Sequence, residues 1–104
     1  MPLMIISTCC DSRSEADDIA RFGVEQGLAA CAHVEEIRSI YRWQGEVCDA
    51  SEWKVSFKSL EGNFDKIATL IRSHHSYDEP AIYAVPILRT SDSYGRWIKA
   101  ESRL

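Results

Sequence analysis

The chain has 104 residues, the length of one ordinary domain, so we expect residues 1–104 to form a single domain. Its 12 basic and 16 acidic residues are interspersed and leave a net charge of −4, which argues against a nucleic-acid partner held through phosphates. The longest apolar run, residues 3–6, is far shorter than the roughly 20 residues that a membrane-spanning helix needs. No signal-peptide pattern is visible either, so we expect a cytoplasmic protein without a membrane partner.

Large apolar side chains are abundant for so short a chain. Hydrophobic residues make up 45% of the sequence, and they include three Trp, four Tyr and three Phe. A domain of this size buries only about 60% of the surface that its unfolded chain exposes, so its own core hides a limited apolar area. We therefore expect the chain to assemble with copies of itself.

The first third of the chain predicts a strand followed by a helix. Residues 3–8 form an apolar run with β-branched members, which is typical of a strand buried on both faces. Ser12 and Glu15 have the spacing of a capping box, and Gly27 can end the helix in a left-handed conformation. Between them, small and apolar residues repeat at helical spacing: Ala16, Ile19, Ala20, Gly23 and Val24.

Two long strands follow, over residues 30–43 and 46–58, with Gln44 and Gly45 as a tight turn between them. Each strand spans on the order of 12 residues, whereas a typical strand has about five or six. A ribbon of that length must project past its own domain, and its aromatic side chains then need a partner surface. We predict that Tyr41, Trp43 and Trp53 lie in a subunit interface.

A second helix is predicted over residues 60–74 with Ser59 as its cap, followed by a turn and a strand over residues 81–85. Pro86 cannot donate to a sheet ladder, which places it at an edge, a bulge or a strand end. Ser91 can cap a last short helix. The resulting order is β-α-β-β-α-β with a C-terminal helix. It is the ferredoxin-like arrangement of the α+β class, with an antiparallel sheet and both main helices on one face.

Four short segments carry a further signal: Gly27-Leu28-Ala29-Ala30-Cys31-Ala32, Ser39-Ile40-Tyr41-Arg42-Trp43-Gln44-Gly45, His75-Ser76-Tyr77-Asp78-Glu79-Pro80 and Trp97-Ile98. In this order and spacing they resemble the CutA family of divalent-cation tolerance proteins, and the resemblance covers essentially the whole chain. It implies a ferredoxin-like subunit in a tight homotrimer, a cytoplasmic protein and an association with copper and other divalent cations. It brings no established enzymatic reaction and no organic cofactor.

The two histidines at the end of the second predicted helix are the first metal candidates. Imidazole suits copper and zinc, and a thiolate nearby favours Cu(I), so we predict a metal site formed by His74, His75 and Cys9. In some members of the family the metal-binding cysteine lies at the end of the first strand, where the register leaves Ser7, Thr8 and Cys9 open. The alternative is structural, since a cationic imidazole suits a helix C-terminus. No C-x-x-C pair is present, and we expect reduced thiols.

An aromatic-lined cleft between subunits is the other candidate site. We place Lys58, His75, Tyr77 and Glu79 there as polar groups, and Trp97 as an aromatic wall. No nucleophile-plus-base pattern, phosphate loop or paired-carboxylate motif is visible, so we expect a binding protein rather than an enzyme.

These observations support two main functional hypotheses. The first is a cytoplasmic homotrimer that binds or senses copper, another divalent cation or a small ligand in its inter-subunit clefts. The second is a structural trimeric scaffold that recruits a protein partner, with copper binding incidental. A third, an unrecognised enzyme, would have to rely on Lys58, His75 and Tyr77.

Overall fold

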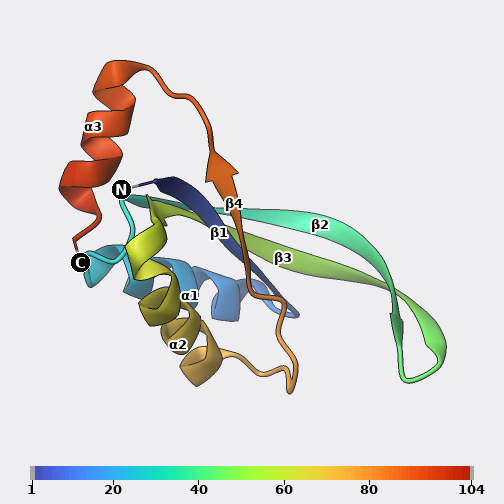
Figure 1. Ribbon diagram of the computed structural model, residues 1–104. Coiled ribbons are helices and arrows are strands. Elements are labelled where there is room, and N and C mark those ends of the chain that lie inside the picture. Colours follow the sequence, from blue (N-terminus) through green and yellow to red (C-terminus); the bar gives the residue numbers. More distant parts are fainter. Residues whose placement is uncertain (1, 104) are drawn as a thin grey trace.

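Residues 2–103, the part of the chain that the computed structural model describes, fold into four strands and three α-helices (Figure 1). In chain order the elements are β1 (Leu3–Cys10), α1 (Arg13–Glu25), β2 (Cys31–Trp43), β3 (Glu46–Leu60), α2 (Phe64–His74), β4 (Tyr83–Ile87) and α3 (Asp92–Glu101). None of the helices in this part of the chain combines the length and the apolar character that a membrane span requires.

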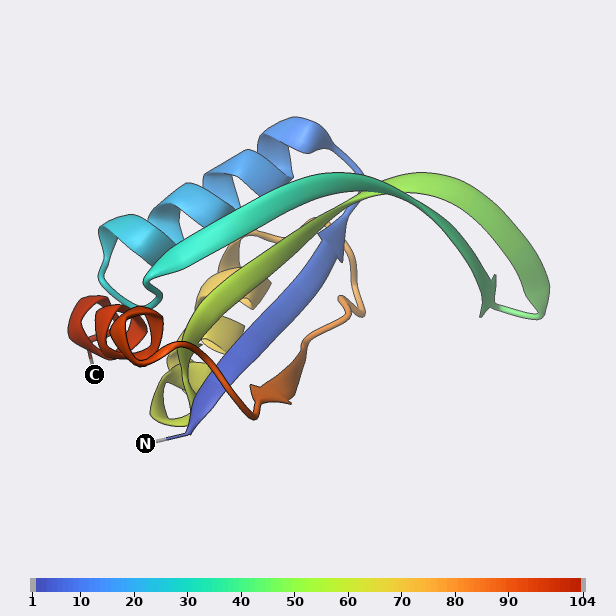
Figure 2. The same ribbon diagram turned by 90° about the horizontal axis from the view of Figure 1, so that it is seen from above.

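The strands form one antiparallel sheet in the order β2-β3-β1-β4, so β2 and β4 are its edges. Both main helices, α1 and α2, cover the same face of the sheet, whereas α3 lies at one end on the other side (Figures 1 and 2). There Gly95 of α3 lies next to the Leu3 side chain. The predicted α+β, ferredoxin-like fold is therefore confirmed in element order, in strand pairing and in helix placement.

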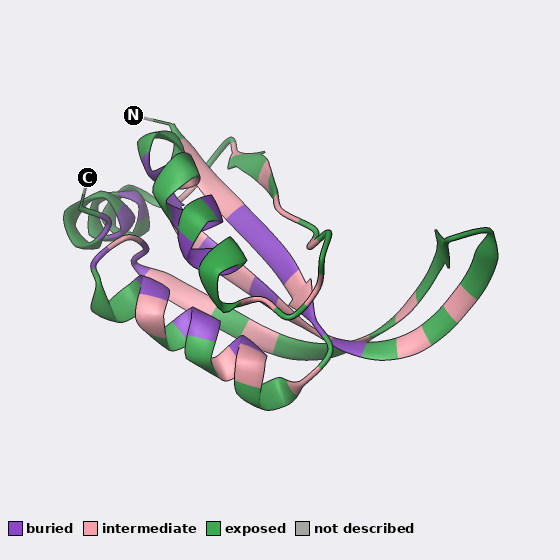
Figure 3. Ribbon diagram, turned by 90° about the horizontal axis from the view of Figure 1, so that it is seen from below, coloured by how far each residue is buried: buried purple, intermediate pink, exposed green. Residues whose placement is uncertain are grey.

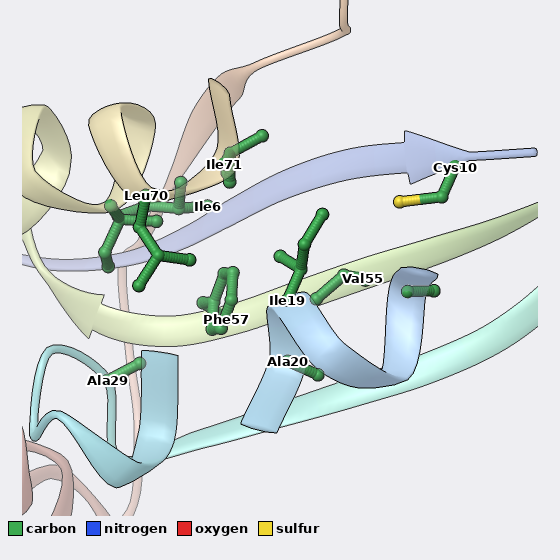
Figure 4. Close-up of a cluster of buried hydrophobic side chains, with 11 residues drawn as sticks. Ile6, Cys10, Ile19, Ala20, Ala29, Val55, Phe57, Leu70 and Ile71 are labelled. Atoms are coloured by element: carbon green, nitrogen blue, oxygen red, sulfur yellow. The ribbon is translucent and has the colours of Figure 1, made fainter. Parts of the chain in front are cut away.

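The hydrophobic core lies between the sheet and the two main helices (Figure 4). Alternate residues of neighbouring strands point into it. Ile6 of β1 pairs with Phe57 of β3, and both side chains are fully buried. Ile19 of α1 belongs to the same cluster. The same alternation places Cys10 in the core and Cys9 on the opposite face of the sheet.

That opposite face, which we call the open face, is only partly covered. It carries the strand residues that alternate with the core positions, among them Cys9, Glu52, Lys58, Tyr83 and Val85. The last two, on edge strand β4, are 42% and 46% exposed. An apolar strand surface of this kind is suited to contact with another chain.

The predicted boundaries hold where local chemistry sets them. The Ser12 hydroxyl accepts a hydrogen bond from the Glu15 backbone N–H and begins α1. Gly27, with φ of 74°, ends the segment after α1. Ser91 caps α3 in the same way as Ser12 caps α1, by accepting from the Tyr94 N–H.

The predicted start of the second main helix is wrong. Ser59 does not cap it, because β3 continues to Leu60 and a short 3-10 turn, Glu61–Asn63, precedes α2. The buried Asn63 side chain explains the delay, since it donates to the backbone carbonyls of Leu28 and Arg103 and ties this turn to two distant segments. The last strand is also shifted, to Tyr83–Ile87. It contains Pro86 as an edge strand can, with the missing donor at the edge of the sheet.

The β2–β3 hairpin is longer than the sheet that it belongs to. Strand β3 has 15 residues, but β1 has only eight and pairs with residues 53–60 alone. Residues 46–52 therefore pair with β2 only, and this part of the hairpin curves away from the body (Figures 1 and 2). Most of it is exposed (Figure 3). Gln44 and Gly45 form its turn with φ of 50° and 81°, as a two-residue turn of type I′ requires.

Candidate functional site

The candidate site lies where the hairpin leaves the sheet. Strand β1 ends there at Cys10, and the segment from His75 to β4 passes around that end on its way from α2 to the edge of the sheet (Figure 1). His75 and Tyr77 fix this segment, residues 75–82, to β1 and β3 respectively. Two arrangements of functional side chains result, one on each face of the sheet.

His75 is held from both sides of its ring. Its Nε2 lies 2.8 Å from the Cys9 backbone oxygen, and its Nδ1 lies 3.1 Å from the Tyr77 backbone nitrogen. A carbonyl can only accept and a backbone N–H can only donate, so this geometry assigns the neutral tautomer with the proton on Nε2. The side chain is completely buried. In this state His75 fastens the 75–82 segment to the end of β1.

Cys10, Glu15 and His75 form the metal-ligand cluster of this site. Their ligand atoms all lie within 4.8 Å of one another, and no other group of three such side chains does so within residues 2–103. The Cys10 Sγ is 3.8 Å from Nε2 of His75, and a Glu15 carboxylate oxygen is 3.7 Å from Nδ1. Burial, followed by the neighbouring Glu15 carboxylate, raises the pKa of the Cys10 thiol to about 12. The thiol is therefore protonated at neutral pH.

This cluster fits a borderline or soft cation by its donor types. Thiolate, imidazole and carboxylate are ligands of zinc, and thiolate favours Cu(I). Ligand atoms about 2.0–2.3 Å from a tetrahedral ion lie roughly 3.3–3.8 Å apart. One ligand atom from each of the three residues lies within 4.8 Å of the others, so the side chains must draw closer around a single ring nitrogen of His75 to hold an ion. Binding requires that Cys10 lose its proton and that His75 give up one of its two hydrogen bonds.

A cleft of about 650 Å³ occupies the open face beside this cluster, between the curved hairpin and the 75–82 segment. Glu52, only 7% exposed, lines it and accepts a hydrogen bond of 2.8 Å from the Tyr77 hydroxyl. Burial and this hydrogen bond to a carboxylate raise the pKa of Tyr77 well above its ordinary range. Burial and the Glu52 charge also raise the pKa of the Cys9 thiol, against a weaker opposite effect of Lys54.

The three predicted metal ligands do not converge. Only the backbone carbonyl of Cys9 contacts His75, because the Cys9 side chain is on the open face and Cys10 takes the inner position. His74 remains on α2, where its Nδ1 donates to the Leu70 carbonyl at 3.0 Å and its ring packs on Phe22. The predicted set of His74, His75 and Cys9 is therefore corrected to a cluster in which Cys10 and Glu15 accompany His75.

The residues predicted for the ligand cleft are only partly together within one subunit. Tyr77 and Glu79 line the cleft. The Lys58 ammonium lies 3.3 Å from the His33 ring, at the opposite end of the sheet, where Lys58 pairs with Ile5. Trp97 stacks on a neighbouring tyrosine within α3. Lys58 and Trp97 thus belong to other parts of the subunit surface.

The predicted interface aromatics occupy two different environments. Tyr41 and Trp43 are 41% and 47% exposed on the hairpin, and both line the cleft. Trp53 faces the helices and packs against the core of its own subunit. The alternation of β3 explains the difference, since Trp53 pairs with Cys10 and shares its inner face.

The sequence comparisons identify the family of this fold and site. The family described as CutA1 divalent ion tolerance protein matches residues 4–101. The chain belongs to this family. A divalent-cation tolerance protein CutA from Thermus thermophilus is 37% identical over 89 residues, which cover 85% of this chain and 86% of that protein. The resemblance carried by the four sequence segments is therefore confirmed.

Other relatives extend the comparison. The chloroplastic CutA protein of Arabidopsis thaliana is 30% identical over 104 residues, a match that spans 99% of this chain but 57% of the plant protein. The solved structure of the periplasmic divalent cation tolerance protein CutA from Archaeoglobus fulgidus matches with a TM-score of 0.93 at 30% identity. The match covers 97% of this chain and 99% of that one.

The prediction that the protein is cytoplasmic, made from the absence of a signal-peptide pattern and from the resemblance, is wrong. One relative is named as chloroplastic and another as periplasmic, so members of the family are assigned to compartments other than the cytoplasm. Membership of the family does not place this chain in any one of them.

The raised pKa of Cys10 predicts a loss of stability in alkali. The folded state keeps the thiol proton up to about pH 12, whereas an ordinary thiol loses it near 9.0. The unfolded state therefore binds fewer protons between these values, so the free energy of unfolding is unaffected by this group below about pH 9 and falls as the pH rises towards 12. Urea unfolding as a function of pH should show this slope in the wild type, and a smaller slope in Cys10→Ala. Equal slopes in the two proteins would contradict the assignment.

Proposed function

We propose that the chain acts as a homotrimer that binds a transition-metal cation, either copper or a divalent ion such as zinc, through Cys10, Glu15 and His75. The convergence of a thiol, a carboxylate and an imidazole carries the proposal. Membership of the divalent ion tolerance family supports it. In this proposal the protein acts by binding and not by catalysis.

The position of His75 gives metal binding a route to a signal. The same ring that offers a ligand atom also accepts the Tyr77 N–H and donates to the end of β1. Recruitment of this ring by a cation releases one of these bonds, which loosens the segment that walls the cleft. Metal occupancy is thereby coupled to the shape of the open face.

Two surfaces support the homotrimer. At the hairpin tip Val47 is 65% exposed, and on the open face Val85 is 46% exposed beside Tyr83. Neither surface can be buried by the subunit itself, because the hairpin extends beyond β1 and α3 covers only one end of the sheet. Contacts among identical chains bury both, while Tyr41 and Trp43 lie at the edge of the hairpin contact with their rings on the cleft. The family resemblance supplies the number three.

The metal proposal is tested by titration with Co²⁺, whose bonds to thiolates give a charge-transfer absorption in the near ultraviolet. Wild-type protein should develop this band to one ion per subunit, and its affinity should rise with pH because each bound ion displaces the Cys10 proton. Cys10→Ser should abolish the band. Cys9→Ser, a matched change one residue away on the other face, should leave it intact.

The role of the imidazole is tested by His75→Gln, which should weaken Co²⁺ binding, whereas Cys48→Ser, near the hairpin tip, should not. Equal affinities in all four variants would show that cations bind to the surface without a defined site. The same titration with Cu⁺ establishes whether copper uses the same ligands.

Assembly is tested with three matched substitutions of exposed valines. Sedimentation equilibrium of the wild type at micromolar concentration should give three times the chain mass. Val47→Lys and Val85→Lys place an unpaired charge in the proposed interfaces and should shift the protein towards monomer. Val24→Lys, on α1 at a position 39% exposed, should remain trimeric. A wild type that is mostly monomeric, or three variants that all stay trimeric, would refute this arrangement.

A further inference from the structure

The Glu52 carboxylate is a buried charge without a counter-charge in its own subunit. It is 7% exposed, and its one hydrogen bond comes from the neutral hydroxyl of Tyr77. Within residues 2–103 the ion pairs are Arg13–Asp17, Arg38–Asp49 and the contact of His75 with Glu15, so none involves Glu52. Isolated buried charges are costly unless they are paired. The position therefore favours a cation from outside the subunit.

The other charged side chains that line the cleft are also acidic. Asp78 and Glu79 line it together with Glu52, and no lysine, arginine or histidine does so within the described residues. Lys54, two residues from Glu52 on the same face of β3, directs its ammonium group over the Tyr83 ring instead.

The walls of the cleft are aromatic. Tyr41 and Trp43 of the hairpin and Tyr77 of the 75–82 segment line the same cleft as Glu52. Aromatic faces attract cations, most strongly when the ion is poorly hydrated and carries its own apolar groups. The volume of about 650 Å³ lies in the range of small-molecule sites, which is about 300–1,000 Å³.

The geometry does not suit a metal ion here. A metal site needs three or more ligand atoms around one point, and within residues 2–103 only Cys10, Glu15 and His75 meet that condition. The cleft's carboxylates and the Cys9 thiol are spread over its walls. We propose that this cleft is a second site, separate from the metal cluster, and that it binds a small organic cation, an ammonium ion with apolar substituents, on Glu52 and the three aromatic rings.

Choline is a suitable probe, and 3,3-dimethyl-1-butanol is its neutral counterpart of nearly the same shape. Equilibrium dialysis of the assembled wild-type protein should show saturable binding of labelled choline. The neutral alcohol, at equal concentration, should compete at least about tenfold more weakly, because it lacks the charge that pairs with Glu52. Cys10→Ser should bind choline as the wild type does, so failure of the metal proposal and failure of this one are distinguished.

Substitutions of Glu52 and Trp43 test whether these residues bind choline, with Glu36→Gln as the control. Glu52→Gln should weaken choline binding by at least about tenfold, whereas Glu36→Gln should leave it within about twofold. Glu36 lies on the neighbouring strand opposite Trp53 and faces the other side of the sheet, so its change removes the same charge outside the cleft. Trp43→Leu keeps apolar volume but loses the π face, and should weaken binding by about fivefold. It tests the site independently if Glu52→Gln fails to fold.

Two results would overturn the proposal. The first is absence of saturable choline binding by the wild type, and the second is equal competition by the neutral alcohol. If the wild type does not bind choline and Glu52→Gln dissociates the trimer, the carboxylate pairs instead with a basic side chain of a neighbouring subunit.

Discussion

The unequal lengths of β1 and β3 are the constraint on which the rest of the molecule depends. Strand β1 ends at Cys10, opposite Trp53 of β3. The other seven residues of β3, 46–52, pair only with β2. The end of β1 is therefore left uncovered by other strands, and the outer part of the β2–β3 hairpin has no neighbouring strand. The open face of the sheet lies where these two features meet. The 75–82 segment covers the strand end, and both candidate sites lie against it. The same feature thus leaves the surfaces that we propose for assembly and brings together the side chains of both candidate sites.

His75 and Glu52 play opposite parts where β1 ends. His75 is neutral and fully hydrogen-bonded, so it contributes to the fold until a cation competes for its ring. Glu52 accepts the hydrogen bond that fixes the 75–82 segment to β3, but no basic side chain of its own subunit pairs with its carboxylate within the described residues. Tyr77 connects the two, because its backbone bonds to His75 and its hydroxyl to Glu52. A change on one face of the sheet can therefore reach the other through a single residue.

Sequence reasoning succeeded where the responsible chemistry is local. The Ser12 cap, the positive φ of Gly27 and the Gln44-Gly45 turn each depend on a few neighbouring residues. It failed for the metal-ligand cluster because Cys9 and Cys10 are adjacent residues of the same type. Only the pairing register of β1 decides that the Cys10 side chain points towards the helices. The alternation of Ile6, Thr8 and Cys10 contained that signal. Nothing local marks Glu52, whose importance arises from where β1 stops, and Asn63 acts through distant carbonyls.

The most direct test of this account is residue-resolved NMR of the backbone amides during separate titrations with Zn²⁺ and with choline. The account predicts that Zn²⁺ perturbs residues 9–15 and the segment that begins at His75. Choline should perturb residues 39–43, Glu52 and the same segment from its other side. Both sets meet at Tyr77, between the cluster and the cleft. Perturbations centred on His33 and Lys58, or on α3, would place binding at the other end of the sheet and contradict the account.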